Sequence, residues 1–198
     1  MAILKIQKLS KIELKVIKGI IGEAFVSNEL FHNWGSEKER YEDVMKYMDA
    51  YVQYVYKSKQ LYANDAYIAF IGIEDSRHPH RFRKLMMLIK MIFKIKYSRL
   101  KMILNYANQI SSCNQKYSKK AHLECAMLCV KKDYQKMGYA SELIEFAIRQ
   151  AQKEKIPMLF DTDVKEYKEM YEHFGITCYN QIKANNGVTR YSLVYKSF

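Results

Sequence analysis

Apolar positions along the chain follow two periods, and together they predict a mixed α/β fold. Apolar side chains recur at three- and four-residue steps in the predicted helices, whereas they alternate or run continuously in the predicted strands. Helices and strands alternate in the second half of the chain, which indicates a mixed α/β sheet. The expected helices are 11–25, 36–58, a helix from Ala140 onward, and 164–174, and the expected strands are 3–9, 60–63, 66–73, 122–130, 158–163, 177–183 and 188–196.

Local signals mark the ends of several of these elements. Ser36 and Glu39 have the S-x-x-E spacing of a capping box at the start of a long helix. Gly175 follows the helix 164–174 and suits the left-handed position after a helix. Asn64-Asp65 and Asn186-Gly187 each separate two strand patterns, so each predicts a β-hairpin.

Residues 81–104 are both apolar and basic, with helical spacing. This segment carries too many charges to span a bilayer, which needs roughly 18 to 20 uncharged apolar residues. A helix that covers the core or shapes a substrate pocket is the favoured interpretation, and a helix lying on an anionic membrane is the weaker one. The polar stretch 108–120 predicts a mobile loop.

Length and composition are those of a globular chain. With 198 residues, 49% of them hydrophobic and 27% charged, one globular domain over 1–198 is expected, with 81–120 as a basic elaboration within it. The N-terminus has lysines throughout and lacks the apolar core of a secretory signal. Four cysteines without a CxxC pair predict reduced thiols in a cytoplasm and no metal site: Cys113, Cys125, Cys129 and Cys178.

The net charge of +12 is concentrated in one region. Residues 81–120 contain eleven Lys and Arg and no Asp or Glu, so the rest of the chain carries only +1 (12 − 11). These cations either solvate a helical face or steer an anionic partner. If these cations line a substrate-binding cleft, they would disfavour polycationic substrates. The cations are Arg81, Arg83, Lys84, Lys90, Lys94, Lys96, Arg99, Lys101, Lys116, Lys119 and Lys120.

The hexapeptide QKMGYA (135–140) lies between the predicted strand 122–130 and the next helix. A helix start exposes backbone N–H groups that attract anions. Neither the Walker pattern G-x-x-x-x-G-K-[ST] nor the Rossmann pattern G-x-G-x-x-G is present. A turn with one glycine can still arrange successive N–H groups around a pyrophosphate.

The segment VKKDYQKMGYASELIEFAI resembles motif A of the GNAT superfamily of acetyl-CoA-dependent N-acetyltransferases. The motif Q/R-x-x-G-x-G/A is filled here by Gln135, Gly138 and Ala140. Downstream, residues 171–176 resemble the Tyr-x-x-x-Gly-Phe element of that family, with Ile176 in place of Phe. The first half is similar to GNAT enzymes with an expanded N-terminal half. The resemblance implies a mostly antiparallel, twisted sheet with flanking helices and splayed central strands.

The resemblance also implies where acetyl-CoA, the expected cosubstrate, binds. Backbone N–H groups of the turn would hold the pyrophosphate, with a hydroxyl from Ser141 and charge from Lys136. Pantetheine would lie along the strand edge, where an N–H of Cys129 or Val130 would polarise the thioester carbonyl. The expected binding residues are Leu128, Cys129, Val130, Gln135, Lys136, Met137, Gly138, Tyr139, Ala140 and Ser141.

Three side chains are candidates for proton transfer during direct acetyl transfer. Glu124 is the first candidate base, because burial within an apolar strand would raise its pKa toward a useful value. His122, two residues earlier, is the second candidate base or a water-relay partner. The resemblance implies that Tyr171 is the general acid for the departing thiolate. The residue Cys129 is expected to be a small core residue rather than a nucleophile.

The expected activity is transfer of an acetyl group from acetyl-CoA to a primary amine by direct attack in a ternary complex, without a metal. The acceptor is expected to be a small-molecule or peptide amine. The alternative is a non-catalytic module whose 81–120 region binds nucleic acid or an anionic membrane. Nucleic acid is not favoured, because no recognisable motif is present and the cations are interleaved with aliphatic residues. The identity of the acceptor and the oligomeric state are left open.

Overall fold

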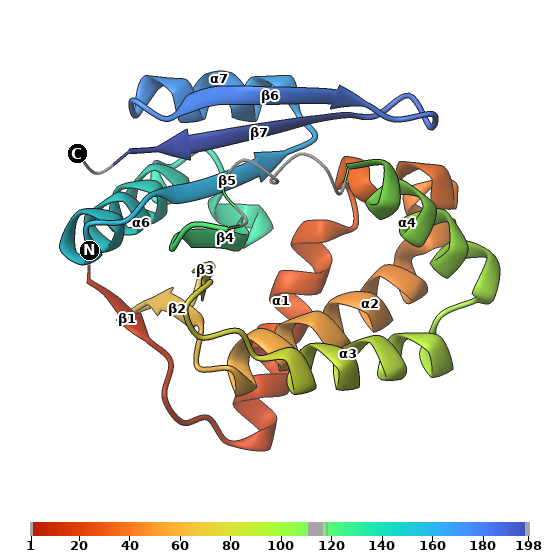
Figure 1. The fold of residues 1–198 in the computed structure, drawn as a ribbon. Coiled ribbons are helices and arrows are strands. Elements are labelled where there is room, and N and C mark those ends of the chain that lie inside the picture. The colour runs from red at the N-terminus through yellow and green to blue at the C-terminus, as the bar shows by residue number, and fades with distance from the viewer. Residues whose placement is uncertain (1, 111–116, 118, 197–198) are drawn as a thin grey trace.

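Seven strands form one open sheet in the order β1-β2-β3-β4-β5-β7-β6 (Figure 1). The structure is a computed structural model that describes residues 2–110, 117 and 119–196. Only β4 and β5 run parallel, and every other neighbouring pair is antiparallel, which confirms the predicted mixed, mostly antiparallel sheet. The strands are β1 (Ile3–Lys5), β2 (Leu61–Asn64), β3 (Ala69–Asp75), β4 (Leu123–Val130), β5 (Met158–Thr162), β6 (Thr177–Lys183) and β7 (Thr189–Tyr195).

The helices begin where side chains cap them. The predicted capping box of Ser36 and Glu39 is present, and a second box joins Ser10 and Glu13. In each box the serine hydroxyl accepts from the backbone of the glutamate, whose carboxylate accepts from the serine N–H. The helices are α1 (Lys11–Phe25), α2 (Glu37–Lys57), α3 (Arg81–Lys94), α4 (Tyr97–Ile110), α6 (Tyr139–Glu154) and α7 (Lys165–His173), with 3₁₀ turns η1 (Glu29–Trp34) and η2 (Lys132–Tyr134).

The basic segment differs from its sequence prediction. It forms two helices, α3 and α4, with a break at Ile95 and Lys96 where the backbone becomes extended. The predicted loop 108–120 begins later than expected, because α4 continues to Ile110; residues 111–116 and 118, with Cys113, lie outside the described residues. In the part of the chain that the structure describes, no helix has both the length and the apolar character needed to cross a membrane.

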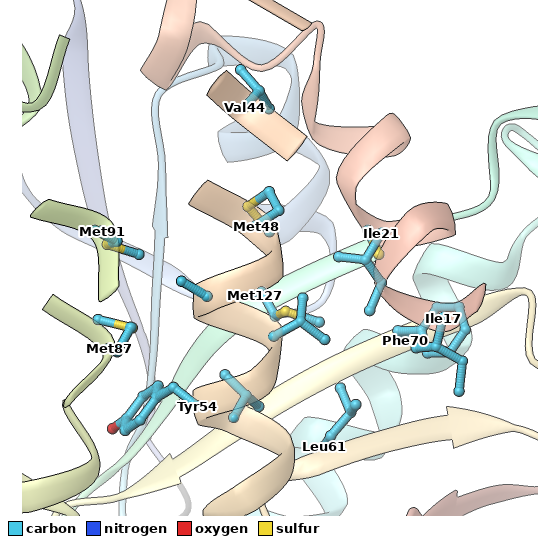
Figure 2. Close-up of a cluster of buried hydrophobic side chains, with 14 of the residues drawn as sticks. Ile17, Ile21, Val44, Met48, Tyr54, Leu61, Phe70, Met87, Met91 and Met127 are labelled. Atoms are coloured by element: carbon cyan, nitrogen blue, oxygen red, sulfur yellow. The ribbon is translucent and has the colours of Figure 1, made fainter. Parts of the chain in front are cut away.

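Helices cover both faces of the sheet. Alternating strand residues supply the two faces, so that Phe70 packs with α1, α2 and α3, whereas its neighbour Ile71 packs with α6. Figure 2 shows the first of these clusters, in which Met48, Phe70 and Met127 meet side chains of α1 and α3. The sheet is therefore held in the middle of the molecule, with buried clusters on both of its faces.

The central strands β4 and β5 separate soon after they begin. Their parallel pairing covers only Leu123 with Met158 and Glu124 with Leu159, although both strands continue. A bulge in β4 at Ala126 shifts the register against β3, and the hydroxyl of Tyr51 on α2 donates a hydrogen bond to the Ala126 carbonyl at 2.9 Å. The predicted splayed central strands are confirmed.

Candidate active site

The turn between β4 and α6 is open on the side of its glycine. Gly138 is the N-cap of α6 and has φ +87°, a left-handed conformation that disfavours any side chain. A Cβ built on Gly138 would meet no atom within 4 Å. Helix geometry leaves the N–H groups of Tyr139, Ala140 and Ser141 without acceptors inside α6. The turn can therefore present several donors to an anion that approaches closely.

Side chains fix this turn against the end of β4. The amide Nε2 of Gln135 donates to the carbonyl of Val130 at 3.3 Å. The rings of Tyr134 and Tyr139 meet edge to face at 6.3 Å, and the ammonium of Lys131 lies 5.5 Å from the Tyr134 ring centre. Gln135, predicted to contact the pyrophosphate, thus has a further role in holding the turn.

The backbone of β4 alternates between β3 and the gap toward β5. The N–H of Lys131 donates to the Ile68 carbonyl at 2.7 Å, which places this residue in a hydrogen-bonded pair with β3. In an antiparallel ladder such pairs alternate, so Cys129 faces β3, whereas Leu128 and Val130 direct their backbone groups into the gap. Of the two predicted oxyanion donors, Val130 rather than Cys129 is placed to reach the gap.

A cavity of about 320 Å³ lies where β4 and β5 separate. Among the predicted site residues, Glu124, Leu128 and Tyr171 line this cavity. His122 is not among the lining residues. The remaining lining comes from the N-terminal half, from β4, from the end of β5, from α7 and from β7. It includes Asn28, Tyr47, Tyr51, Glu74, Lys84, Asp161, Asp163, Tyr167 and Arg190.

Glu124 lies in a cluster of acidic side chains. It pairs across the ladder with Glu74 of β3, and Asp161 lies on the neighbouring strand β5. Burial raises the pKa of Glu124 to about 7, and the charges of Asp161 and Glu74 add to this rise. A carboxylate with this pKa can accept a proton near neutral pH.

Tyr171 occupies the inner side of α7. Its ring packs on Phe160 of β5, with the ring centres 5.0 Å apart, and only 6% of the residue is exposed. Burial raises the pKa of Tyr171 well above its usual range, so the phenol stays protonated. A protonated hydroxyl in the cavity wall can donate a hydrogen bond to a developing anion.

His122 is buried just before β4 begins and is held by backbone contacts. Its Nδ1 lies 2.7 Å from the Lys120 carbonyl, and its own N–H donates to the Ser76 hydroxyl at 2.9 Å. The structure therefore places His122 near the start of β4, apart from the cavity lined by Glu124 and Tyr171. Its predicted role as a base or relay stays a prediction.

A buried ion pair at the cavity edge was missed by the sequence prediction. The guanidinium of Arg190 on β7 donates to Asp163 through Nε at 2.6 Å and Nη2 at 3.0 Å, and the Tyr106 hydroxyl of α4 donates to Asp163 at 2.5 Å. Asp161 lies 3.6 Å from Arg190. The alternation of aspartates at the end of MLFDTD signals Asp161 and Asp163, whereas no local pattern marks Arg190 or Glu74.

Replacing Asp163 with asparagine is expected to lower the free energy of unfolding by about 3 kcal/mol, because it leaves the buried Arg190 without its main partner. The matched control is Glu172→Gln, which breaks an exposed pair with Lys168 (2.8 Å) and should change stability by about 0.5 kcal/mol or less. Urea unfolding of both variants measures this difference. Equal effects would show that the Asp163 network does not stabilise the fold.

Most of the cations on α3 and α4 do not line the cavity. Of the cations between 81 and 110, Lys84 alone lines it, and Lys90 and Lys94 instead bind Asp49 of α2 at 2.6 and 3.4 Å. The lining carries four carboxyl groups against the two cations Lys84 and Arg190. The cavity is therefore acidic although the chain as a whole is basic.

Cysteine and metal chemistry have little support in the described residues. Burial raises the pKa of Cys129 to about 12, so its thiol stays protonated, and burial also raises the pKa of Cys125. Within the described part of the chain, no group of three or more His, Cys, Asp or Glu is arranged to hold a metal ion.

Comparison with known proteins agrees with this geometry. Residues 102–175 match the family model described as the acetyltransferase (GNAT) domain. No curated protein matches the chain by sequence.

Three solved structures similar to this chain share its fold over nearly their whole length. One is a Corynebacterium glutamicum protein described as histone acetyltransferase HPA2 and related acetyltransferase (TM-score 0.63, 11% identity, 98% of this chain and 95% of that chain). Another is the C-terminal condensation domain of Ebony with beta-alanyl-dopamine (TM-score 0.65, 10% identity, 98% and 97%). A third is an agmatine N-acetyltransferase variant (TM-score 0.60, 10% identity, 98% and 98%). These structures show the same fold, and the family model matches the part of the chain that carries the motif A resemblance.

Proposed function

We propose that this chain, which has the fold of GNAT acetyltransferases and matches their domain model, moves an acetyl group from acetyl-CoA to a primary amine. The observation that carries the proposal is the opening between β4 and β5, which ends at the open glycine turn. An extended thiol carrier laid along the Leu128 and Val130 backbone would bring its pyrophosphate to that turn. We further propose that residues 1–198 act as one acyltransferase domain.

Each group of residues has a distinct task in this proposal. The N–H groups of Leu128 and Val130 hold pantetheine and donate to the oxygen that gains charge at the thioester carbonyl. The backbone of the turn, with the Ser141 hydroxyl and the charge of Lys136, binds the pyrophosphate. Cys129 packs in the core beside this edge. Acetyl-CoA supplies the activated acetyl group. The residues of the turn are Gln135, Lys136, Met137, Gly138, Tyr139 and Ala140.

Protein side chains handle the two protons of the transfer. An ammonium group is not nucleophilic and must first lose a proton. Glu124, whose pKa of about 7 leaves it ionised at higher pH, accepts this proton directly or through water. His122 is the second candidate for this step. The new C–N bond forms as the C–S bond breaks, and Tyr171 donates a hydrogen bond or its proton to the departing sulfur.

The acceptor that fits the cavity best is a cationic amine. Glu74, Glu124 and Asp161 give the cavity a local negative charge, which attracts an ammonium group and repels anionic acceptors. The rings of Tyr47 and Tyr51 supply an apolar wall for the carbon skeleton of the acceptor.

We also propose a cytoplasmic location for this protein. The cysteine pattern of the sequence is its only support.

Isothermal titration with acetyl-CoA, followed by thiol release with a panel of amines, tests the proposal. Binding of acetyl-CoA, together with much weaker binding of pantetheine that lacks the pyrophosphate, would support the site. Faster thiol release with diamines than with amino acids of net negative charge would support the cationic acceptor. No heat at about millimolar acetyl-CoA would overturn the enzyme assignment.

Replacing Tyr171 with phenylalanine should lower the turnover number by about tenfold to a hundredfold, because the departing sulfur loses its hydrogen-bond donor. The affinity for acetyl-CoA should stay nearly unchanged, since the ring still packs on Phe160. Tyr41→Phe, on α2, about half exposed and not among the lining residues of the cavity, is the matched control and should keep wild-type turnover. Unchanged turnover in Tyr171→Phe would remove this residue as the acid.

A further inference from the structure

The outward face of α3 is apolar along its whole length. Surface helices normally bury their apolar stripe and expose polar residues, but α3 also exposes a second apolar stripe to solvent. Phe82 is 74% exposed and Phe93 is 84% exposed, and Tyr97 at the start of α4 is 79% exposed. The apolar outward face consists of Phe82, Leu85, Met86, Ile89, Ile92 and Phe93, at helical spacing.

A second set of apolar residues fixes the orientation of this helix. Met87 and Met91 point inward and are buried against α2, as Figure 2 shows. On the flank of the helix, Lys90 and Lys94 both bind Asp49 of α2. Burial alone would raise the pKa of Asp49, but hydrogen bonds from Lys90 and Lys18 outweigh it and lower the pKa to about 2. The apolar outward face therefore cannot rotate inward without breaking these contacts.

The surroundings of the apolar outward face are strongly cationic. No Asp or Glu occurs between residues 81 and 120. Arg81 and Arg83 lie exposed at the start of α3, and Lys96 and Lys101 lie exposed beyond its end. Apolar residues on one side of a helix with cations around them are the signature of a helix that lies in a membrane interface.

We propose that α3 docks this protein on an anionic lipid surface. Phe82 and Phe93, about three turns apart, enter the interface between headgroups and acyl chains. Arg81, Lys96 and Lys101 contact the anionic headgroups around them. This docking does not depend on the proposed acetyltransferase activity.

Other occupants fit the apolar outward face less well. A second copy of this chain would bring two strongly cationic segments together, and like charges repel. Nucleic acid would satisfy the cations, but it would leave the aliphatic residues of the face exposed to water. An anionic membrane satisfies both the cations and the apolar side chains. In Figure 1, α3 runs along the periphery outside α2, where a flat surface can reach it.

Docking would also place the active site near the membrane. Lys84 on the other flank of α3 lines the cavity that holds Glu124. A groove of about 750 Å³ between α2 and α3, lined in part by Phe82, Met86 and Ile89, adjoins the apolar outward face. An amine presented at the lipid interface would therefore lie close to the catalytic cavity.

Sedimentation with lipid vesicles tests this docking. The full-length protein should bind vesicles containing phosphatidylglycerol at about one third of the lipid, and it should bind phosphatidylcholine vesicles far more weakly. The double variant Phe82→Ser/Phe93→Ser should lose about tenfold or more of this binding. The matched control is Leu4→Ser/Ile12→Ser, which removes two exposed apolar side chains elsewhere and should bind like the wild type. Circular dichroism checks that both variants fold.

Charge variants and salt separate the contributions to binding. Arg81→Gln/Lys96→Gln should weaken binding to anionic vesicles, as should a rise in salt. Absence of wild-type binding to anionic vesicles would overturn the proposal. Equal vesicle binding by Phe82→Ser/Phe93→Ser and the wild type would also overturn it. Two other results would do the same: a wild-type dimer that becomes a monomer in this variant, or salt-sensitive binding to single-stranded DNA without vesicle binding.

Discussion

Replacing Gly138 with tryptophan is expected to lower the affinity for acetyl-CoA by about a hundredfold or more. The indole would fill the open side of the turn, where a pyrophosphate would otherwise meet the backbone N–H groups. Losing two hydrogen bonds to a charged ligand, each worth about 1.5 to 3 kcal/mol, accounts for this loss. The left-handed φ of +87° adds a strain of about 1 to 2 kcal/mol in any residue with a Cβ. Isothermal titration measures the change.

Gly187 offers a closely matched control for this substitution. It also has φ +87°, and a Cβ there would likewise meet no atom within 4 Å, but it lies in the hairpin between β6 and β7. Gly187→Trp should therefore carry the same backbone strain and keep the affinity for acetyl-CoA. If Gly138→Trp binds as tightly as Gly187→Trp, the turn does not hold the pyrophosphate and the enzyme assignment is lost.

Replacing Glu124 with glutamine is expected to lower the turnover number by about a hundredfold to ten-thousandfold at pH 8, because the base is removed. The wild-type rate should fall as pH drops through about 7, the pKa of Glu124, since the carboxylate then becomes protonated. This limb should be missing in the variant. A rate profile from pH 5.5 to 9 tests the assignment, and a variant that keeps the limb would exclude Glu124 as its source.

The same substitution should stabilise the fold, which separates a catalytic effect from unfolding. The folded-state pKa of Glu124 is about 7 against a usual value of 4.5, so ionisation opposes folding as pH rises from 4.5 to 7. Above pH 7 this opposition amounts to about 3 kcal/mol. Glu124→Gln should therefore unfold at higher urea than the wild type at pH 8 and show a smaller gain at pH 5. Lower stability at pH 8 would contradict the buried carboxylate.

Much of the fold could be predicted from local patterns. The helix 11–25, the Ser36 cap and the hairpin at Asn186-Gly187 each follow from side-chain periodicity or turn chemistry, and all are present. The break at Ile95 and the extension of α4 to Ile110 were missed. The helix α4 also makes tertiary contacts that no local window contains, such as the ion pair of Arg99 with Asp43 at 2.6 Å.

The candidate site could be predicted only where the chain is locally distinctive. The glycine turn and Glu124 within an apolar strand stand out in the sequence, so their places could be expected. The acidic partners of Glu124 could not, because Glu74 and Asp161 come from strands far away in the chain and meet only through sheet register. Similarly, the exposed apolar face of α3 could not be predicted without knowing which side of the helix packs on α2.

If acetyl-CoA binds where β4 and β5 separate, as proposed, it becomes part of the sheet itself. Strands β1 to β4 and strands β5 to β7 are joined along the sheet by two residue pairs, with α6 packed across both halves. The amide groups of pantetheine would hydrogen-bond to the edge of β4 in the place of a strand, which would make the whole sheet more rigid. Adding acetyl-CoA should then slow amide hydrogen exchange at Leu128 and Val130, before any acceptor amine is added.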